Sequence, residues 1–163
     1  MKSSNQHILE YLIINKDYRD NVITPKSFDE LHKIIIDRYD KLGPGTEQNP
    51  VDFNDIDISN IYSFYNKNKG MFNGTKFKYI DISDWNVSNI VSMFGMFSNC
   101  KELESIGDIS DWHVSKVTRM GYMFFGCKKL KSIGDISYWD VSNVTYMLHM
   151  FRCSGIENTP YWY

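Results

Sequence analysis

A repeat of 27 residues is the feature that most constrains the fold of this chain. Three segments align without gaps, at residues 81–97, 108–124 and 135–151. Each contains Asp-Ile-Ser-x-Trp, then Val-Ser-x-Ile or Val-Ser-x-Val, then Met-x-x-Met-Phe. A fixed period of this length is typical of proteins whose units stack, because one unit cannot bury its apolar face alone. We therefore expect stacked units that share an interior of Met, Phe and Trp side chains.

A fourth, decayed copy lies upstream of the three regular ones. Residues 58–61 match the Val-Ser-Asn-Ile element, and residues 70–72 match the Gly-Met-Phe of residues 95–97. Four extra residues, placed within 66–69, separate the two parts. We expect them to bulge out of the unit, since first repeats are commonly atypical.

The apolar spacing within a repeat predicts its local structure. Residues 103–109 carry an apolar side chain at every third position, which suits a short strand and its entry. The Met-rich element has the i, i+3, i+6, i+7 spacing of one helix face, in the first regular copy Ile90, Met93, Met96 and Phe97. The expected fold class is an α/β repeat solenoid in which each unit is a short strand plus a short helix.

The repeated motif also resembles a known family. Asp-Ile-Ser-Asp-Trp-x-Val-Ser-x-Val-Thr-x-Met-x-x-Met-Phe-x-x-Cys is similar to the BspA-like leucine-rich repeat family, often described as surface proteins. The resemblance covers roughly residues 55–153. It implies a leucine-rich-repeat-like array used for protein contacts or adhesion.

Three regions are expected along the chain. Residues 1–50 form a helical N-terminal cap, residues 51–155 the repeats, and residues 156–163 an aromatic tail. In the cap, Ser27 and Glu30 form a capping box, and Gly43 ends the apolar stripe that follows it. An earlier helix is predicted at about residues 5–15. The tail either closes the last repeat or projects to a second copy or a partner, and closure is favoured because the open end exposes apolar surface.

Composition narrows the partners. The chain has 18 basic and 20 acidic residues and a net charge of −2, so nucleic acid is not the expected partner. No apolar run is long enough for a signal core or a membrane span. We therefore expect a cytoplasmic protein without a membrane contact, with the cell surface as the alternative if a leader was removed. Cys100, Cys127 and Cys153 fit no zinc pattern, and no cofactor is expected.

Catalytic chemistry is not expected either. A reaction needs a base, a nucleophile or a metal within hydrogen-bond reach, and the four His residues form no such pattern. Asp81, Asp108 and Asp135 recur in register and could stack into a calcium site or a negative stripe that imitates nucleic acid. The favoured interpretation is structural, because Asp before a Ser turn commonly accepts from local backbone N–H groups.

Positions that differ between stacked units do not serve the shared packing, so they are the candidates for partner contact. Tyr and Arg are the usual interface anchors. One candidate cluster is expected on the helical face and a second on the strand side. The predicted partner-binding residues are Arg119, Tyr122, Phe125, Tyr138, Tyr146, His149 and Arg152, together with Asp108, Asp111 and His113.

The expected function is a non-catalytic protein-binding module, for example a small inhibitor that blocks the working surface of a larger protein. The alternatives are a fragment of a cell-surface adhesin and a nucleic-acid mimic that uses the Asp ladder. A homo-oligomer formed through the aromatic tail is a further alternative.

Overall fold

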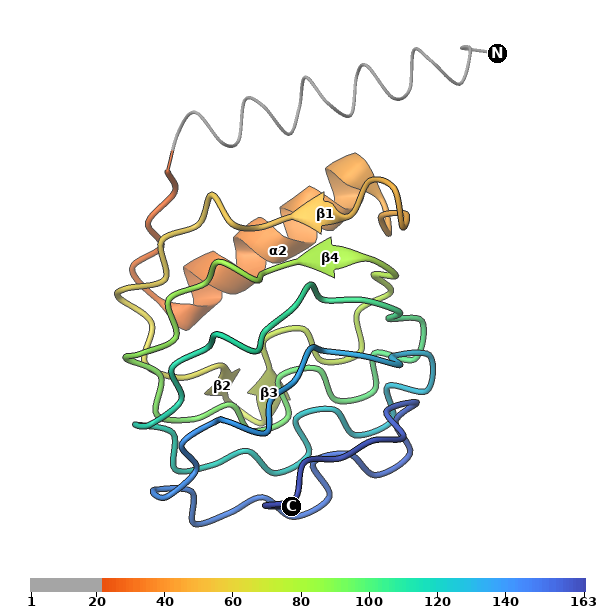
Figure 1. Ribbon diagram of the computed structural model, residues 1–163. Helices are drawn as coiled ribbons and strands as arrows, with labels where there is room; N and C mark the ends of the chain where they lie inside the picture. The colour runs from red at the N-terminus through yellow and green to blue at the C-terminus, as the bar shows by residue number, and fades with distance from the viewer. Residues whose placement is uncertain (1–21) are drawn as a thin grey trace.

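The computed structural model describes residues 22–163, and helix α2 (Phe28–Leu42) lies at one end of it (Figure 1). The Ser27 half of the capping box is confirmed, since its side chain accepts from the Glu30 N–H at 3.2 Å. The Glu30 carboxylate accepts from the Lys26 N–H at 2.7 Å instead of from the Ser27 N–H. The predicted stop is confirmed as well, because Gly43 has φ 76° and its N–H donates to the Tyr39 carbonyl at 2.7 Å. The helix expected at 5–15 falls outside the described residues.

The predicted α/β solenoid of strand-plus-helix repeats is wrong, and so is the leucine-rich-repeat-like description. Within residues 22–163 the structure has one α-helix and two two-stranded sheets, and the rest is turns and irregular backbone. Strand β1 (Val51–Asp52) pairs in parallel with β4 (Ile80–Asp81), and β2 (Tyr65–Asn66) pairs antiparallel with β3 (Lys69–Gly70). The fold is small and mixed.

The predicted short helix fails for a local reason. The backbone N–H of Met96 donates to Met93 O at 3.2 Å, that of Ser98 to Gly95 O, and that of Cys100 to Phe97 O, which makes a run of separate turns. Gly95 and Asn99 have φ of 58° and 60°, so the backbone leaves the right-handed region every fourth residue. Apolar spacing alone does not distinguish such turns from a helix.

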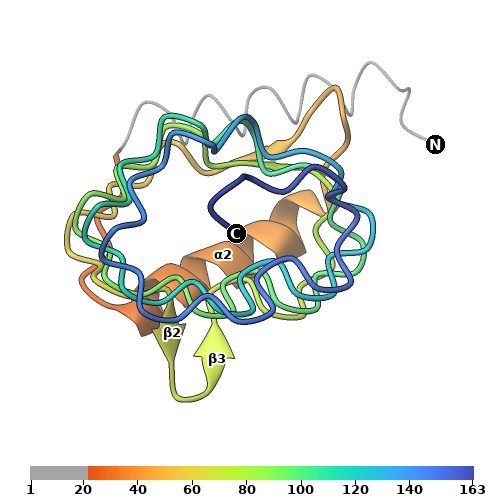
Figure 2. The same ribbon diagram turned by 60° about the horizontal axis from the view of Figure 1, so that its bottom comes forward.

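The 27-residue spacing nevertheless places segments of the chain side by side. We call residues 52–80, 81–107, 108–134 and 135–155 tiers 1 to 4; Figure 1 shows them following one another from α2 to the C-terminus. Isolated parallel bridges join Ser63 to Ser92, Ser92 to Arg119, and Arg119 to Tyr146. Figure 2, which looks along the tiers, shows their backbones largely superimposed.

Stacked aromatic rings fill the interior between tiers. Phe72, Phe97, Phe124 and Phe151 stack in turn, with ring centroids 5.1, 5.5 and 5.7 Å apart and planes within 16°. Trp112 stacks on Trp139 at 6.4 Å. The expected Met, Phe and Trp interior is confirmed, since the described core includes the side chains of Met93, Met96, Met120, Met123 and Phe124, each 0% exposed.

The aromatic tail packs on tier 4. The Trp162 ring lies 6.4 Å from Trp139, and its Nε1 donates to the Ile136 carbonyl at 3.2 Å. Tyr163 meets Phe151 edge-on at 5.0 Å. The closing role is confirmed for Trp162, whereas Tyr163 stays 47% exposed and Tyr161 88%.

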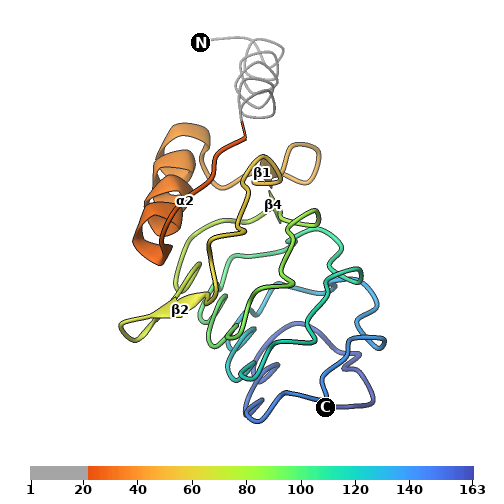
Figure 3. The ribbon, with the colours of Figure 1, turned by 90° about the vertical axis from the view of Figure 1, so that its left-hand side faces the viewer.

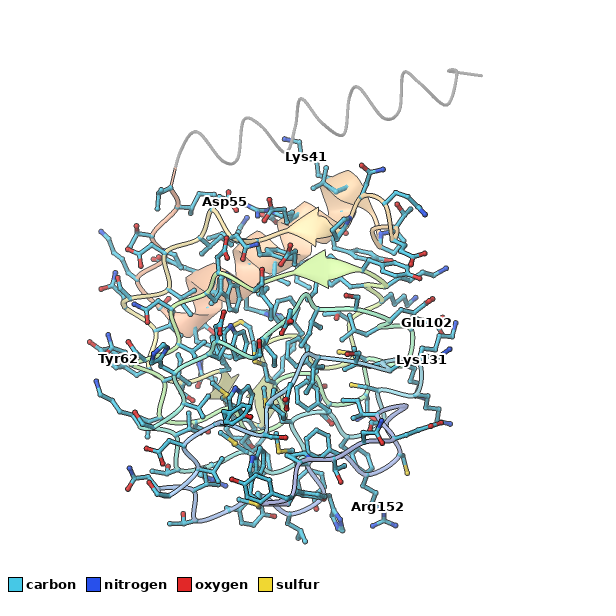
Figure 4. All side chains as sticks on the ribbon, in the orientation of Figure 1. Lys41, Asp55, Tyr62, Glu102, Lys131 and Arg152 are labelled. Atoms are coloured by element: carbon cyan, nitrogen blue, oxygen red, sulfur yellow. The ribbon has the colours of Figure 1, made fainter. Side chains whose placement is uncertain are left out.

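A buried ion pair holds α2 against tier 1. Both Arg38 and Asp55 have side chains 1% exposed, and two guanidinium nitrogens donate to the carboxylate at 2.7 and 3.0 Å. Arg38 also donates to the Asp52 carbonyl at 2.5 Å and lies 4.9 Å from the Phe53 ring centroid. Figure 4 labels Asp55 close to the helix. The pair satisfies two charges that would otherwise be buried alone.

The four extra residues of the decayed copy do bulge out, as predicted. They form the turn of the β2–β3 hairpin, in which Lys67 and Asn68 have φ of 46° and 67°. This pair of left-handed residues is the geometry of a tight two-residue hairpin turn. Figure 3 shows the hairpin projecting from the side of the molecule that also carries α2.

The three cysteines have two different environments. Cys100 and Cys127 are buried, and their thiols donate to the carbonyls of Phe72 and Phe97 at 2.8 and 3.0 Å. The Cys100 thiol beside it and burial together raise the pKa of Cys127 far above its ordinary value. Cys153 is exposed, because it follows Gly126, and not Cys127, by one repeat length.

We predict that Asp55→Ala lowers the free energy of unfolding by about 3–5 kcal/mol, because it leaves the Arg38 charge buried without its carboxylate. Urea unfolding followed by circular dichroism measures the change. The control is Asp37→Ala, which breaks the exposed pair with Lys33 and should stay within about 0.5 kcal/mol. Equal effects of the two variants would contradict the role given to the buried pair.

We predict that a thiol reagent modifies Cys153 alone in the native protein and all three cysteines after unfolding in guanidinium. The thiolate is the reactive form of cysteine. Because Cys127 is buried and its pKa is raised, its thiol stays protonated and unreactive. Absorbance of the released thiol counts the reacted groups, and Cys153→Ser is the control that should abolish the native reaction. Native reaction of more than one cysteine would contradict the described packing.

Candidate functional site

Half-buried aromatic rings form a continuous patch across the tiers, on the side where the hairpin begins. We call this the aromatic patch. Its rings touch one another and carry two arginines, and none of its members belongs to the closely packed interior. The members are Tyr65, Phe94, Tyr122, Phe125, Tyr146 and His149, with Arg119 and Arg152.

Phe94 is the centre of one half of the patch. Its ring centroid lies 4.8 Å from that of Tyr65, 5.5 Å from Tyr122 and 5.9 Å from Tyr146. The guanidinium of Arg119 lies 5.0 Å from the Phe94 centroid and 5.7 Å from that of Tyr146. The arginine is thus held by cation–π contacts, and no residue of the described chain accepts a hydrogen bond from it.

Tyr122 joins the second half. Its ring lies 5.5 Å from Phe125 and 5.3 Å from His149, in both cases near edge-to-face. His149 Nε2 lies 3.4 Å from Nη1 of Arg152. Figure 4 labels Arg152 at the end of the molecule opposite α2. The patch therefore runs from the hairpin in tier 1 to the free end of tier 4.

A glycine makes room for one of these rings. A Cβ built on Gly121 would stand 2.2 Å from Cε1 of Tyr146, so a larger residue there would displace the tyrosine. The equivalent residues in the tiers on either side are Phe94 and Leu148. Because Gly121 has only a hydrogen atom at this position, the Tyr146 ring reaches across tier 3 to Phe94.

Two members of the patch occupy a strained backbone position. Gly95, Tyr122 and His149 are equivalent residues, and their φ values are 58°, 58° and 59°. Glycine adopts this left-handed region freely, whereas other residues pay about 1–2 kcal/mol there. Tyr and His stand where glycine would fit with less strain, which is the kind of local cost that clusters at functional sites.

The ten predicted partner-binding residues separate into two groups. The predicted helical face does not exist as a helix, but six of its residues meet in the aromatic patch: Arg119, Tyr122, Phe125, Tyr146, His149 and Arg152. The other four lie on the Asp-Ser turns. There Asp111, His113 and Tyr138 line a hollow of about 400 Å³ beside Trp112 and Trp139, and Tyr138 is 90% exposed.

The Asp ladder is held within its own turns. Oδ1 of Asp81, Asp108 and Asp135 accepts from the backbone N–H two residues later at 3.0, 2.9 and 3.0 Å. Backbone and side-chain bonds from Ser137 lower the pKa of Asp135 below its ordinary value. A Cβ on Gly134 would meet Asp108 Oδ1 at 1.8 Å, so the carboxylate packs directly against the backbone at the end of its own tier. Within residues 22–163, no three His, Cys, Asp or Glu side chains group as a metal site.

Phe94 and Tyr65 belong to the patch but were absent from the predicted set. Phe94 could have been found, because its position varies as Phe, Gly and Leu across the three regular copies, like the positions that were chosen. Tyr65 lies in β2 of the decayed copy, where the alignment of the repeats is interrupted. No internal comparison could have indicated it.

Residues 50–160 match the model of the family described as "Mycoplasma protein of unknown function, DUF285". The chain belongs to this family. The matched stretch contains the whole aromatic patch and all four tiers. No curated protein and no solved structure matches the chain. The resemblance to BspA-like leucine-rich repeats stays a prediction. None of the helical structure in residues 22–163 has the length and apolar character of a membrane span.

We predict that Gly95→Ala lowers the free energy of unfolding by about 1 kcal/mol, although a Cβ there would meet only the Ser98 side chain at 3.8 Å. The cost is conformational, because φ is 58°. Tyr122→Gly relieves the same strain but loses ring contacts, so its change should stay within about 1 kcal/mol of zero. Urea unfolding of both variants checks this. A stabilising Gly95→Ala would contradict the backbone assignment.

Proposed function

We propose that this chain is a non-catalytic protein-binding module and that the aromatic patch is its binding surface. The observation that carries the proposal is the presence of Tyr122 and His149 in left-handed backbone, at a position where Gly95 serves the fold. Neither side chain is needed for the interior. Their presence on the surface, at a cost in stability, favours a role in contact with another molecule.

The composition of the patch supports a protein partner. Aromatic residues and Arg are enriched in the few residues that carry most of the binding energy of protein interfaces. Here the rings already touch one another in the free chain, with centroid distances of 4.8–5.9 Å. Side chains that are ordered before binding lose less conformational entropy on association.

Arg119 adds a directional contact. Stacked over Phe94 and Tyr146, its guanidinium is fixed in orientation and leaves its N–H groups available to an incoming acceptor. A partner carboxylate or carbonyl at this point would meet a donor that is already in place. The patch thus offers both a large apolar contact and a polar group that sets the orientation of the partner.

The test compares capture from an extract of the source organism by four forms of the immobilised chain. These are the original chain, Tyr122→Gly, His149→Gly and Tyr138→Ser, with captured proteins quantified by mass spectrometry. We expect one or more proteins to be enriched by the original chain and by Tyr138→Ser, and to fall at least about tenfold with either glycine variant. The glycine variants keep the fold, because Gly95 occupies the same position.

Two results would contradict the proposal. Equal capture by all four forms would place the contact elsewhere on the chain. Loss of capture with Tyr138→Ser alone would assign it to the hollow that Asp111 and His113 share with Tyr138. Circular dichroism of each variant confirms that a loss of capture is not a loss of structure.

A further inference from the structure

On the aromatic-patch side, one row of alternate backbone N–H groups donates in the same direction along the stack. In tier 2, the N–H groups of Met93, Gly95, Phe97 and Asn99 donate to carbonyls of tier 3 at 2.7–2.9 Å. In tier 3 the equivalent groups donate to tier 4 at 2.8–3.0 Å: Met120 to Tyr146, Tyr122 to Leu148, Phe124 to Met150 and Gly126 to Arg152. In this row, each tier therefore gives donors to the next tier and acceptors to the one before.

Within residues 22–163, no further tier follows tier 4. The N–H groups of Met147, His149, Phe151 and Cys153 are equivalent to the four donors of tier 3, and no described residue accepts from them. The carbonyls between them already accept from tier 3. We call this row of four N–H groups the donor edge. Figure 1 shows tier 4 at the end of the molecule opposite α2.

The aromatic tail does not pair with the donor edge. Trp162 and Tyr163 pack on the rings of Trp139 and Phe151, and the Trp162 Nε1 donates to the Ile136 carbonyl. The N–H of Gly155 turns back to the Cys127 carbonyl at 3.0 Å. The tail thus covers the apolar interior of tier 4 and leaves the four donors of its backbone rim open.

The charge along this side of the molecule is of one sign. The four segments that build this side of the molecule, residues 62–70, 91–99, 118–126 and 145–153, contain Lys67, Lys69, Arg119 and Arg152. None of the 20 acidic residues of the chain lies in them. Asp29 of α2 lies 4.0 Å from Lys67 at the far end of the patch, and Asp135 lines the same hollow as Phe151 at the end of tier 4.

We infer that the donor edge binds an extended, acidic segment of a partner protein. Its main-chain carbonyls would accept from Met147, His149, Phe151 and Cys153, as a strand does when it adds to an open edge. Its carboxylates would meet Arg152 and Arg119. The inference rests on the proposed function and names the chemistry of the partner.

The direction of the hydrogen bonds disfavours a second copy of this chain. Two copies that met through tier 4 would bring donor against donor, since the carbonyls of residues 146–152 are already occupied within each copy. At the other end of the stack, α2 covers tier 1, where His32 Nδ1 lies 2.9 Å from the Met71 carbonyl. A polypeptide with free carbonyls satisfies the edge, and a copy of the edge does not.

The test uses the full chain and a peptide probe of 20 L-glutamate residues, with the D-glutamate peptide as the matched control. Both probes carry the same charge, but only the L-peptide presents its carbonyls in the hand that a natural strand has. Titration followed by NMR of the backbone amides measures binding. We expect the L-peptide to bind about tenfold more tightly than the D-peptide.

Hydrogen exchange provides the second readout. In the free chain the amides of the donor edge should exchange at least about tenfold faster than those of Met120, Tyr122, Phe124 and Gly126. The L-peptide should slow the four edge amides and leave the tier 3 amides unchanged. Met147→Pro removes one backbone donor of the edge. Met147→Ala also removes the methionine side chain but keeps the backbone N–H. Proline should therefore weaken L-peptide binding by about fivefold relative to alanine.

Three results would overturn the inference. One is equal binding of the two peptides, which would reduce the effect to charge alone. Another is tighter binding of a 20-nucleotide oligothymidylate than of the L-peptide, which would assign the surface to nucleic acid. The third is no binding or no amide protection at millimolar peptide. In each case, capture that is lost with Tyr122→Gly would still support the proposed function, so the two failures are distinguishable.

Discussion

The backbone hydrogen bonds between tiers are the constraint on which the rest of the structure depends. Because the N–H groups of one tier reach the carbonyls of the next, equivalent residues are held one above another along the stack. Stacking of Phe72, Phe97, Phe124 and Phe151 follows from this register. So does the continuity of the aromatic patch, since its members come from equivalent positions of different tiers. Little regular secondary structure is needed, because pairing between tiers satisfies the backbone.

The sequence predicted the interior and the helix of the cap, because these depend on patterns that are local or repeated. Ser27 and Gly43 act as helix ends within a few residues of where they stand, and the repeated Met and Phe positions are buried. The strand-plus-helix unit was wrong, because three-residue apolar spacing occurs both in a helix and in a run of turns. The positive φ values of residues such as Asn99 distinguish the run of turns from a helix. The residue types did not require those φ values.

The candidate site was predicted in part for a similar reason. Comparing copies of the repeat identified side chains that vary, and six of them form the aromatic patch. The comparison also selected Asp108, although its carboxylate accepts from the Ser110 N–H in its own turn and packs against the Gly134 backbone. It could not show the direction of the hydrogen bonds along the stack. The donor edge is a property of the backbone alone and leaves no trace in the residue types of tier 4.

Gly95, Tyr122 and His149 occupy the same slot of tiers 2, 3 and 4, and the side chain in this slot can evolve separately from the interior. The side chain at this slot leaves the backbone outward, so it can be exchanged without repacking the Phe stack behind it. Exchange in one tier also leaves the interior of the other tiers unchanged, because each presents its own copy of the slot and Tyr122 meets Phe94 and His149 at the surface. Natural selection can therefore alter what such a molecule recognises one tier at a time, while the buried framework is inherited intact.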